Sequence, residues 1–401
     1  MTVTAELTGA PAGRRSRSSL AVGVVSMRDL DRARWRDLEA SASEPNVFYG
    51  PLVMPSFVET LGHGREVQAL RVDGEAGAID ALFPFRRSLR WGGPFPVAEI
   101  VDHPFSCSSV PLVRQGREDE VARRFLSALS SGEAPARAWL LTRMPTDGAV
   151  CEALERHAEA EGVAAIWFDR HVRAMLWPGR GAREDFPVSG GSKLKKYRQL
   201  GRRLEEQGEV SFETLHSREE VAAGVETFLE LEAAGWKGRL GTAALQHPEQ
   251  AAFFRGAVPA LAGNGQAHID ALRLDGSVIA IGITLSCGWR SWLWKIAFDE
   301  AHAKHSPYVQ LLMHQTSQAL QAGEPVEYDS CSKPDSSLVD RIWHQRRGFG
   351  DLLLVPHRGL PGPAMAKFLE TKRREAREQA VKLRDAVRNR LRPAKKTSPA
   401  P

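Results

Sequence analysis

The chain has 401 residues, 42% of them hydrophobic, which is enough for two ordinary domains with separate cores. Its net charge of +5 is uneven, because the residues from Lys367 onward hold 12 Lys and Arg against 4 Asp and Glu. Four cysteines without CxxC spacing, and no apolar run near the roughly 20 residues of a spanning helix, argue against a zinc site, a disulfide framework and a membrane span. We therefore expect a cytoplasmic protein without a metal.

Residues 1–20 are predicted to form a disordered leader. Arg14-Arg15 ahead of Leu20 superficially resembles a twin-arginine export signal. The apolar stretch that follows is short and has no evident small-residue cleavage site, so a leader that enters a first strand is favoured.

Residues 21–180 are predicted to form a first lobe. Strands and helices alternate along it, which is typical of a mixed sheet with helices on its faces. The expected helices cover residues 30–40, 46–61, 118–129 and 149–161, and the expected strands cover 67–72, 79–85, 138–142 and 164–169.

Residues 186–358 are predicted to form a second lobe, after a junction rich in Gly and Pro. A Gly-rich cluster at 189–192 caps a basic helix that ends near Gly208, and Asp275-Gly276 closes a hairpin because Gly accepts a positive φ. Ser306-Pro307 predicts a sharp helix start, with the serine side chain as cap. The expected strands cover 210–215, 266–274, 277–286, 292–298, 326–328 and 351–355, the expected helices 218–234, 248–262, 307–321 and 334–346, and a loop covers 236–242.

This order of elements and a set of local motifs resemble one family. The motifs are Arg202-Arg203-Leu204 with Gly208, Phe228 with Leu231-Glu232, Trp236-Lys237-Gly238 with Gly241-Thr242, Ala280 with Ile283, Lys295 to Asp299, Ser306-Pro307 and Tyr328-Asp329. Together they resemble the GNAT-superfamily acyltransferases, in the CelD/BcsL branch with a BioF-like acetyltransferase domain, related to FemAB-type peptidoglycan enzymes. The resemblance covers roughly residues 25–357.

The resemblance implies a fold and a co-substrate. The fold is of the α+β class: two tandem GNAT-like lobes, each a mixed, mostly antiparallel sheet flanked by helices. The tail over residues 361–401 is predicted from its own residues to be a basic helix. The co-substrate is acetyl-CoA or another acyl-CoA. One departure is Tyr308, because relatives usually have Gly after the Ser-Pro pair, and a side chain there would crowd a nucleotide.

The expected donor site lies where strand 292–298 separates from the strand that follows it. Free amides at a helix start attract anions, so the diphosphate of the donor is expected at Ser306-Pro307 beside Lys304 and His305. The pantetheine arm resembles a peptide and is expected along the open strand edge, where a backbone amide near Ala297 polarises the thioester carbonyl. The predicted donor-binding residues are Ile296, Ala297, Phe298, Lys304, His305, Ser306, Pro307 and Tyr308.

An attacking amine must be neutral, so a base is needed. Asp329, at the end of an apolar strand, is the first candidate, and the alternative is a turn aspartate. Lys295 in an apolar strand needs a partner, and we expect it to bind an acidic group or to pair with Asp329; the alternative is an exposed sheet face. Asp299 binds substrate or positions its loop. The predicted acceptor-binding residues are Glu232, Trp236, Lys237 and Tyr328, whereas His268 is predicted to be structural and Trp292 and Trp294 to lie in the core.

The sequence therefore predicts an N- or O-acyltransferase that acts by direct transfer on an amine or hydroxyl of a sugar, amino acid or cell-envelope precursor. Two alternatives stay open: a non-catalytic GNAT-like binding protein recruited to membrane or nucleic acid by its basic tail, and a FemAB-like transferase that uses aminoacyl-tRNA. The tail is a solvated appendage, an arm on the lobes or a second subunit, or a contact for an anionic membrane at the inner face or for nucleic acid. Of these last two, membrane is the favoured partner, and the oligomeric state stays open.

Overall fold

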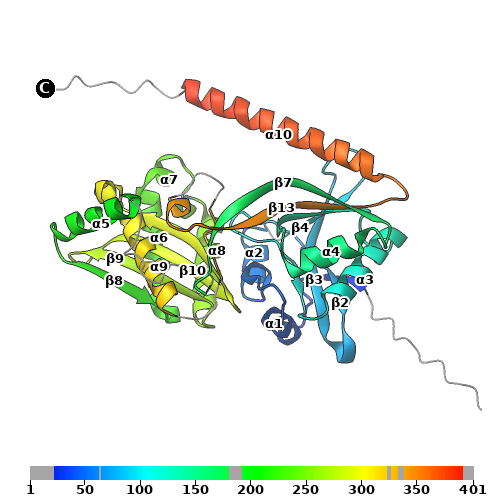
Figure 1. Cartoon of the computed structure of the whole chain (residues 1–401), viewed down its shortest axis with the longest axis horizontal. Coiled ribbons are helices and arrows are strands. Elements are labelled where there is room, and N and C mark those ends of the chain that lie inside the picture. The colour runs from blue at the N-terminus through cyan, green and yellow to red at the C-terminus, as the bar shows by residue number, and fades with distance from the viewer. Residues whose placement is uncertain (1–21, 63–64, 180–191, 323–326, 333–337, 392–401) are drawn as a thin grey trace, which may run out of the picture.

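The computed structural model describes residues 22–62, 65–179, 192–322, 327–332 and 338–391, so the predicted leader and most of the Gly-rich cluster lie outside the described residues. Two lobes stand side by side, and two long strands, β7 and β13, run from one to the other (Figure 1). The long helix α10 crosses above the first lobe.

The first lobe is built from a twisted sheet with helices on both faces. The helices α3 and α4 pack side by side, and α1 and α2 lie on the other side of the sheet. Its elements are β1 (Val22–Ser26), α1 (Arg32–Ala40), η1 (Val47–Tyr49), α2 (Val53–Glu59), β2 (Gln68–Asp73), η2 (Glu75–Gly77), β3 (Ile79–Ser88), β4 (Val97–Ile100), β5 (Leu112–Val113), α3 (Glu118–Ser131), β6 (Ala138–Pro145), α4 (Ala149–Ala158) and β7 (Val163–Leu176).

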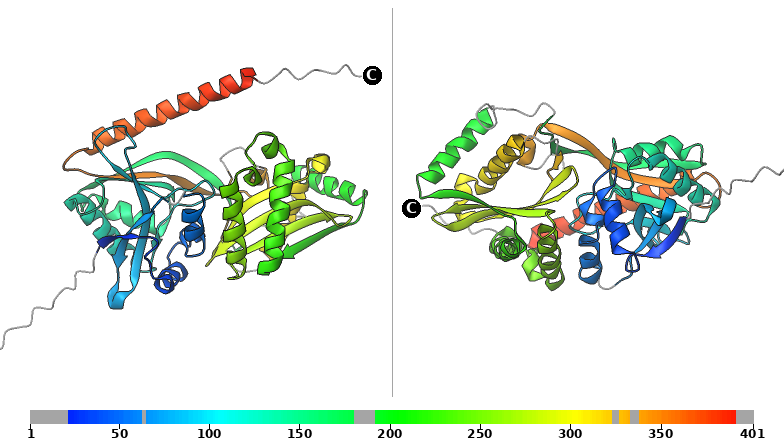
Figure 2. Two further views of the ribbon diagram at one scale, coloured as in Figure 1. Left: turned by 180° about the vertical axis from the view of Figure 1, so that it is seen from behind. Right: turned by 90° about the horizontal axis from the view of Figure 1, so that it is seen from below.

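The second lobe has its own layers. The helices α6 and α8 cover one face of the sheet, and α5 and α9 cover the other, as the view from below shows (Figure 2, right). Its elements are α5 (Ser192–Glu205), β8 (Val210–Leu215), α6 (Arg218–Ala234), α7 (Trp236–Arg239), η3 (Ala244–Gln246), α8 (Pro248–Ala262), β9 (Ala267–Leu274), β10 (Ser277–Cys287), β11 (Arg290–Phe298), η4 (Glu300–His305), α9 (Pro307–Gln321), β12 (Glu327–Asp329), η5 (Val339–Arg341), β13 (Gln345–Pro356) and α10 (Pro363–Leu391).

One continuous sheet joins the two lobes. The strand order is β1-β2-β3-β4-β6-β13-β7-β12-β11-β10-β9-β8, with β5 on β3. The last strand of the chain, β13, inserts between β6 and β7 of the first lobe, and the far end of β7 pairs with β12 of the second lobe. One buried cluster, from Met27 to Leu354, includes side chains of both lobes. The lobes therefore share a sheet and a core.

The helix α10 is fixed to the first lobe through one buried carboxylate. Glu370 is 0% exposed and accepts hydrogen bonds from Arg90 Nε (2.8 Å), Trp91 Nε1 (2.9 Å) and Arg374 Nε (2.7 Å). Packing on a lobe is thus observed for the first half of this helix, whereas a membrane or nucleic-acid contact of the tail stays a prediction. None of the helices in the described ranges is long and apolar enough to cross a membrane.

Most predicted elements are confirmed, and one is wrong. The bounds of α6, α8, α9 and β8 agree with the prediction, since capping residues and prolines mark their ends. The helix predicted over 334–346 is wrong: residues 333–337 lie outside the described part, a short 3-10 turn covers Val339–Arg341, and Gln345 already begins β13. The short strands β4 and β5 were not predicted, and α7 lies within the predicted loop.

Candidate functional site

The strands β11 and β12 run in parallel and then separate. Their pairing covers only three residues on each side, from Arg290 and Glu327 to Trp292 and Asp329. Because β11 continues to Phe298, its edge from residue 293 onward has no partner on the β12 side among the residues that the structure describes. This is the open strand edge that the sequence predicted.

Buried charges fix the closed end of this opening. Glu327 lies 2.7 Å from Arg290 Nε in an ion pair and accepts a hydrogen bond from Arg347 Nη1 at 2.9 Å. Glu44 of the first lobe lies 3.4 Å from Arg347 Nη2. All four side chains are buried. Two carboxylates and two guanidinium groups balance each other, so the pairing at this end is held firmly and the separation begins at a defined residue.

A β-bulge turns β11 at the opening. Ile283 of β10 pairs with Lys295, but its neighbour Thr284 pairs with Leu293, so Trp294 is the extra residue. Beyond the bulge, Asp299 N donates to Ile279 O, so the peptide groups of Asp299 face β10. In an antiparallel pair the peptide groups of successive residues point alternately toward the partner and away from it, so those of Ile296 and Phe298 point toward the open edge. The peptide group of Ala297 itself faces β10. The backbone amides that can polarise the carbonyl are therefore those of Ile296 and Phe298, and not that of Ala297.

A cavity of about 350 Å³, here called the slot, fills the opening. Leu293, Ile296 and Phe298 pack with the side chains of the α9 face, while Trp294 lies in the core cluster on the other face. The slot therefore reaches both faces of the sheet. Its lining residues are Trp236, Lys237, Gly282, Ile283, Leu293, Trp294, Lys295, Ile296, Phe298, Tyr308, Gln315, Ser330, Cys331 and Ser332.

Lys295 reaches the slot from the face that meets the first lobe. Its Nζ lies 4.6 Å from the ring centre of Phe105 and 5.6 Å from that of Trp294, and Trp294 Nε1 donates to Phe105 O at 2.6 Å. Burial lowers the pKa of Lys295, and the positive charge of Lys237 lowers it further. The aromatic faces stabilise the cation only in part. The site thus contains an amine that loses its proton more readily than a surface lysine does.

Asp329 is turned away from the slot into a buried ion pair. Its carboxylate is 2% exposed and accepts from Arg173 Nη1 of β7 at 2.7 Å and from Cys331 N at 2.8 Å. The same Arg173 Nη1 donates to Cys107 O at 2.9 Å. The pairing of Lys295 with Asp329 expected from the sequence is therefore wrong, because the first lobe supplies the partner. This pair holds the start of the segment 330–332, which forms one wall of the slot.

Three predicted residues shape the mouth of the slot. Trp236 is 51% exposed, and its backbone N donates to Glu300 Oε1 at 2.6 Å. Lys237 forms an ion pair with Glu232, whose second oxygen accepts from Ala244 N at 2.8 Å. Lys237 and Trp236 line the slot, whereas Glu232 is buried behind them and orients Lys237.

Two other predicted residues lie elsewhere. Asp299 caps η4, accepting from Ala301 N at 2.9 Å, and lies 3.1 Å from His302 Nδ1, so its bonds position the loop. Tyr328 points to the α9 face, with its ring centre 6.5 Å from that of Trp343. It lines a separate cavity below the slot.

The start of α9 differs from the prediction in its cap. Ser306 lies in the left-handed region (φ 53°) and its side chain makes no capping hydrogen bond; its carbonyl accepts instead from Val309 N and Gln310 N at 2.8 and 3.1 Å. Pro307 has no N–H, so fewer amides are left for an anion than expected. His305 is buried and its pKa is lowered by burial and by Lys304, so the positive charge here is that of Lys304. The ring of Tyr308 packs against the cluster of α5 and α9 side chains and forms part of the slot wall.

Residues of the first lobe in the site were not predicted. Phe105 and Arg173 come from a loop and a strand more than 110 residues before β11, which begins at Arg290, and their sequence neighbours show no motif. The bulge at Trp294 also left no signal. Trp294, whose ring centre lies 5.6 Å from Lys295 Nζ, was predicted from the sequence only as a core residue.

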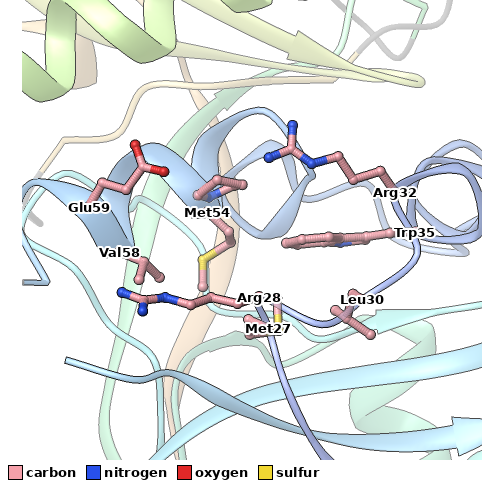
Figure 3. A pocket seen from close by; sticks show the side chains of 9 residues that line it. Met27, Arg28, Leu30, Arg32, Trp35, Met54, Val58 and Glu59 are labelled. Atoms are coloured by element: carbon pink, nitrogen blue, oxygen red, sulfur yellow. The ribbon is translucent and has the colours of Figure 1, made fainter. Parts of the chain in front are cut away.

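Other hollows suit acyl transfer less well. A cavity of about 320 Å³ in the first lobe has an apolar wall that includes Trp35 and Met54, with Arg28, Arg32 and Glu59 around it (Figure 3). None of the residues that line it belongs to a strand. A groove of about 500 Å³ between α5 and α9 is lined by Lys195, Arg198, Gly201, Arg202, Glu205, Gln310 and Met313. Its α9 residues lie on the side of that helix away from Tyr308 and Gln315, which line the slot.

Residues 191–332 match a family model described as an acetyltransferase (GNAT) domain. The stretch that carries β11, the slot and α9 is thus similar to GNAT-type acetyltransferase domains. No curated protein matches the chain.

Solved structures share the two-lobed arrangement. The chain is similar to FemX, with 14% identity over 82% of this chain and 96% of that chain and a TM-score of 0.54. It is also similar to a conserved protein of unknown function from Bacteroides thetaiotaomicron VPI-5482, with 10% identity over 82% and 98% of the two chains and a TM-score of 0.50. A tandem GNAT protein from the clavulanic acid biosynthesis pathway matches at 14% identity over 83% and 98%, with a TM-score of 0.41. At these identities the likeness to FemX and to the Bacteroides thetaiotaomicron protein shows the fold alone, a mixed α+β fold.

Proposed function

We propose that this protein is an acyl-CoA-dependent acyltransferase that moves an acyl group directly from the thioester to an amine or hydroxyl. The observation that carries the proposal is the slot: the pairing of β11 with β12 stops at Trp292 and Asp329 and leaves a strand edge facing a cavity of about 350 Å³. A pantetheine arm has amide groups spaced like those of a peptide, so it can add to such an edge as a further strand.

In this proposal the donor lies along Ile296 and Phe298. Their backbone amides are directed toward the slot and are the groups that can hydrogen-bond the thioester oxygen as it gains negative charge. The diphosphate lies near Lys304 at the start of α9, where the helix dipole adds to the lysine charge. Tyr308 sits against the wall and leaves the slot open.

In this proposal the acceptor approaches from the face of the sheet opposite α9, between the two lobes. Trp236 offers an exposed ring at the mouth, and Lys237 carries the charge that can hold an acidic group of the acceptor. Lys295 is the proton acceptor in this proposal, because burial lowers its pKa and its Nζ lies at the slot. Asp329 is a positioning residue: through Arg173 it holds the wall formed by residues 330–332.

The acceptor class is a sugar, amino acid or cell-envelope precursor, and acetyl-CoA is the first donor to test. The CelD/BcsL-type resemblance belongs to the same proposal. A contact of the basic end of α10 with an anionic membrane would place the enzyme near such a precursor, and it too is part of the proposal.

Donor binding is tested without knowledge of the acceptor. Acetyl-CoA at 100 times its Kd should raise the free energy of unfolding by about 2.7 kcal/mol. Ser332→Phe, which places a ring in the slot, should abolish this gain, whereas Ser211→Phe on the exposed edge strand β8 should keep it. A native chain that no acyl-CoA protects would overturn the proposal.

The outcome also separates a second function. The likeness to FemX makes an aminoacyl-tRNA donor the specific alternative. Protection by aminoacyl-tRNA and by none of the acyl-CoA esters would favour that alternative. A panel of amine and hydroxyl acceptors, with release of the CoA thiol as readout, then identifies the acceptor.

A further inference from the structure

A second cavity lies on the α9 face, directly below the slot. It has a volume of about 250 Å³ and shares two lining residues with the slot, Leu293 and Gln315. Its floor is formed by strands β8 to β12 and its roof by α9 and Trp343. The other lining residues are Thr214, His216, His268, Asp270, Thr284, Gln318, Ala319, Ala322, Tyr328 and Trp343. We call it the polar cavity.

A buried hydroxyl group without a partner belongs to a residue in the wall of this cavity. Thr284 is 1% exposed, lines the cavity, and its Oγ1 has no hydrogen-bond partner in the part of the chain described. It lies across from His268 on β9 and from Leu293 on β11. A buried hydroxyl left unpaired is costly, so a group that enters the cavity and bonds to it would recover that cost.

A buried carboxylate sets the charge of the cavity. Asp270 accepts from Thr214 Oγ1 and Gln315 Nε2, both at 2.7 Å, and its Oδ2 lies 3.5 Å from His268 Nε2. Burial raises the pKa of Asp270, but His268 and the two hydrogen bonds outweigh it, so the pKa is held below its ordinary value. The carboxylate stays ionised at neutral pH and disfavours a second anion nearby.

The position of the cavity identifies what would enter it. A thioester carbonyl held at the open edge lies close to the bulge, and Leu293 is the bulge residue that faces α9. The acyl chain beyond the carbonyl would therefore be aimed past Leu293 and Gln315. The cavity has room for about eight waters at roughly 30 Å³ each, far more than the single methyl group of an acetyl donor fills.

Resting on the proposed function, we propose that the polar cavity receives the acyl group of the donor and selects a short acyl chain that carries a hydroxyl. Thr284 and His268 supply hydrogen bonds to that hydroxyl, and Tyr328 and Trp343 supply an apolar wall for the chain. The negative charge of Asp270 rejects acyl groups that end in a carboxylate.

The test compares three donors of similar size: 3-hydroxybutyryl-CoA, butyryl-CoA and succinyl-CoA, with free CoA as reference. Their dissociation constants are measured by calorimetry on the full chain, so no acceptor is needed. We expect 3-hydroxybutyryl-CoA to bind about tenfold tighter than butyryl-CoA, the gain of one good hydrogen bond, and succinyl-CoA to bind most weakly.

Thr284→Val tests the residue itself. This variant should bring the ratio of the dissociation constants of butyryl-CoA and 3-hydroxybutyryl-CoA close to one. It should not lower the melting temperature, since the hydroxyl it removes has no partner. Thr227→Val on α6, remote from the cavity, should leave the ratio at about ten.

A ratio near one in the native chain, or a ratio that Thr284→Val leaves unchanged, overturns this inference alone, provided that the CoA esters bind. If neither CoA nor any ester binds, the proposed function fails and the inference fails with it.

Discussion

The two lobes repeat one order of elements but differ at the place where two parallel strands stop pairing. In the first lobe β4 and β6 pair in parallel from Val97 and Ala138, as β11 and β12 do in the second. Continuing that register sets Asp102 opposite Arg143, and these two side chains form an ion pair. In the second lobe the continued register sets Leu293 opposite Ser330, with the slot between them.

The helices that follow differ in charge. α3 of the first lobe begins with Glu118, Asp119 and Glu120, which suit the positive end of the helix dipole and repel a diphosphate. α9 of the second lobe has no acidic residue in its first turn and follows Lys304. The comparison teaches that the order of elements does not by itself make a donor site. The side chains where the strands separate, and those in the first helical turn, decide which lobe has one.

The strongest test of this contrast removes the amine in the slot. Lys295→Met should lower turnover by about 10² to 10⁴, the usual contribution of a proton acceptor, and should leave protection by acyl-CoA in place. Turnover is measured with the acceptor that the thiol-release panel identifies. Lys295→Arg keeps the positive charge, but a guanidinium group does not give up its proton readily. This variant should therefore lose as much turnover as Lys295→Met.

Full turnover by Lys295→Arg would show that only a positive charge is needed at this position. The role of proton acceptor would then be withdrawn, and the slot would remain a donor site.

The buried charges at the closed end of the slot and the ion pair that joins the separating strands of the first lobe should differ in their contribution to stability. Glu327→Gln leaves Arg290 and Arg347 buried with one charge fewer and should cost about 3–5 kcal/mol in the free energy of unfolding. The matched variant in the first lobe, Asp102→Asn, breaks a partly exposed pair and should cost less than about 1 kcal/mol. Urea denaturation of both variants measures the difference, and equal costs would contradict the assignment of Glu327 as the fixed end.

Local signals predicted most of the second lobe. The prolines at 248 and 307 mark helix starts that the structure reproduces, because such end effects depend only on near neighbours. The structure adds a capping box of Ser217 with Glu220 at the start of α6. The open edge of β11 was expected from the resemblance to GNAT acyltransferases, and the short pairing of β11 with β12 confirms it, whereas its use as a donor face stays a prediction. These parts depend on residues close together in the chain.

Long-range placement was not predictable from the same signals. The strand β13 inserts between β6 and β7 of the first lobe. The alternation of side chains along Gln345–Pro356 predicts a strand, but it does not show which strands lie beside it. Arg173 as the partner of Asp329, and Phe105 beside Lys295, depend on that exchange. Asp270, two residues after His268 on the same face of β9, was visible in the sequence and was overlooked as its partner.

The pH dependence of stability checks the environment of Lys295 independently of turnover. Burial lowers the pKa of Lys295 in the folded chain below its ordinary value of 10.5. Between the two values the unfolded chain binds more protons, so the stability of the native chain rises with pH in that window. Lys295→Met removes the buried charge and should be more stable than the native chain at pH 7, with an advantage that shrinks as the pH approaches 10.5.

Thermal or urea unfolding at several pH values measures this trend. Lys372→Met, at an exposed position of α10, is the matched control and should show no such trend. An advantage of Lys295→Met that grows with pH would mean that the lysine is stabilised as a cation, which would contradict its role as a proton acceptor.

The smallest expected effect concerns the helix starts. Lys304→Ala removes the exposed positive charge beside α9 and should weaken binding of acyl-CoA about two- to fivefold. Glu118→Gln makes the matched change of one charge at the start of α3 and should leave acyl-CoA binding unchanged, because the first lobe is not expected to bind the donor. Calorimetry at low salt measures both, since screening reduces such effects.

A thioester of pantetheine, which has no phosphate groups, tests whether Lys304 acts through its charge on the diphosphate or by shaping the loop before α9. Lys304→Ala should bind it as well as the native chain does, because the lysine acts only on the diphosphate. Equal losses for both thioesters would mean that Lys304 acts by shaping the loop before α9, and the position of the diphosphate would then have to be sought along the basic groove between α5 and α9.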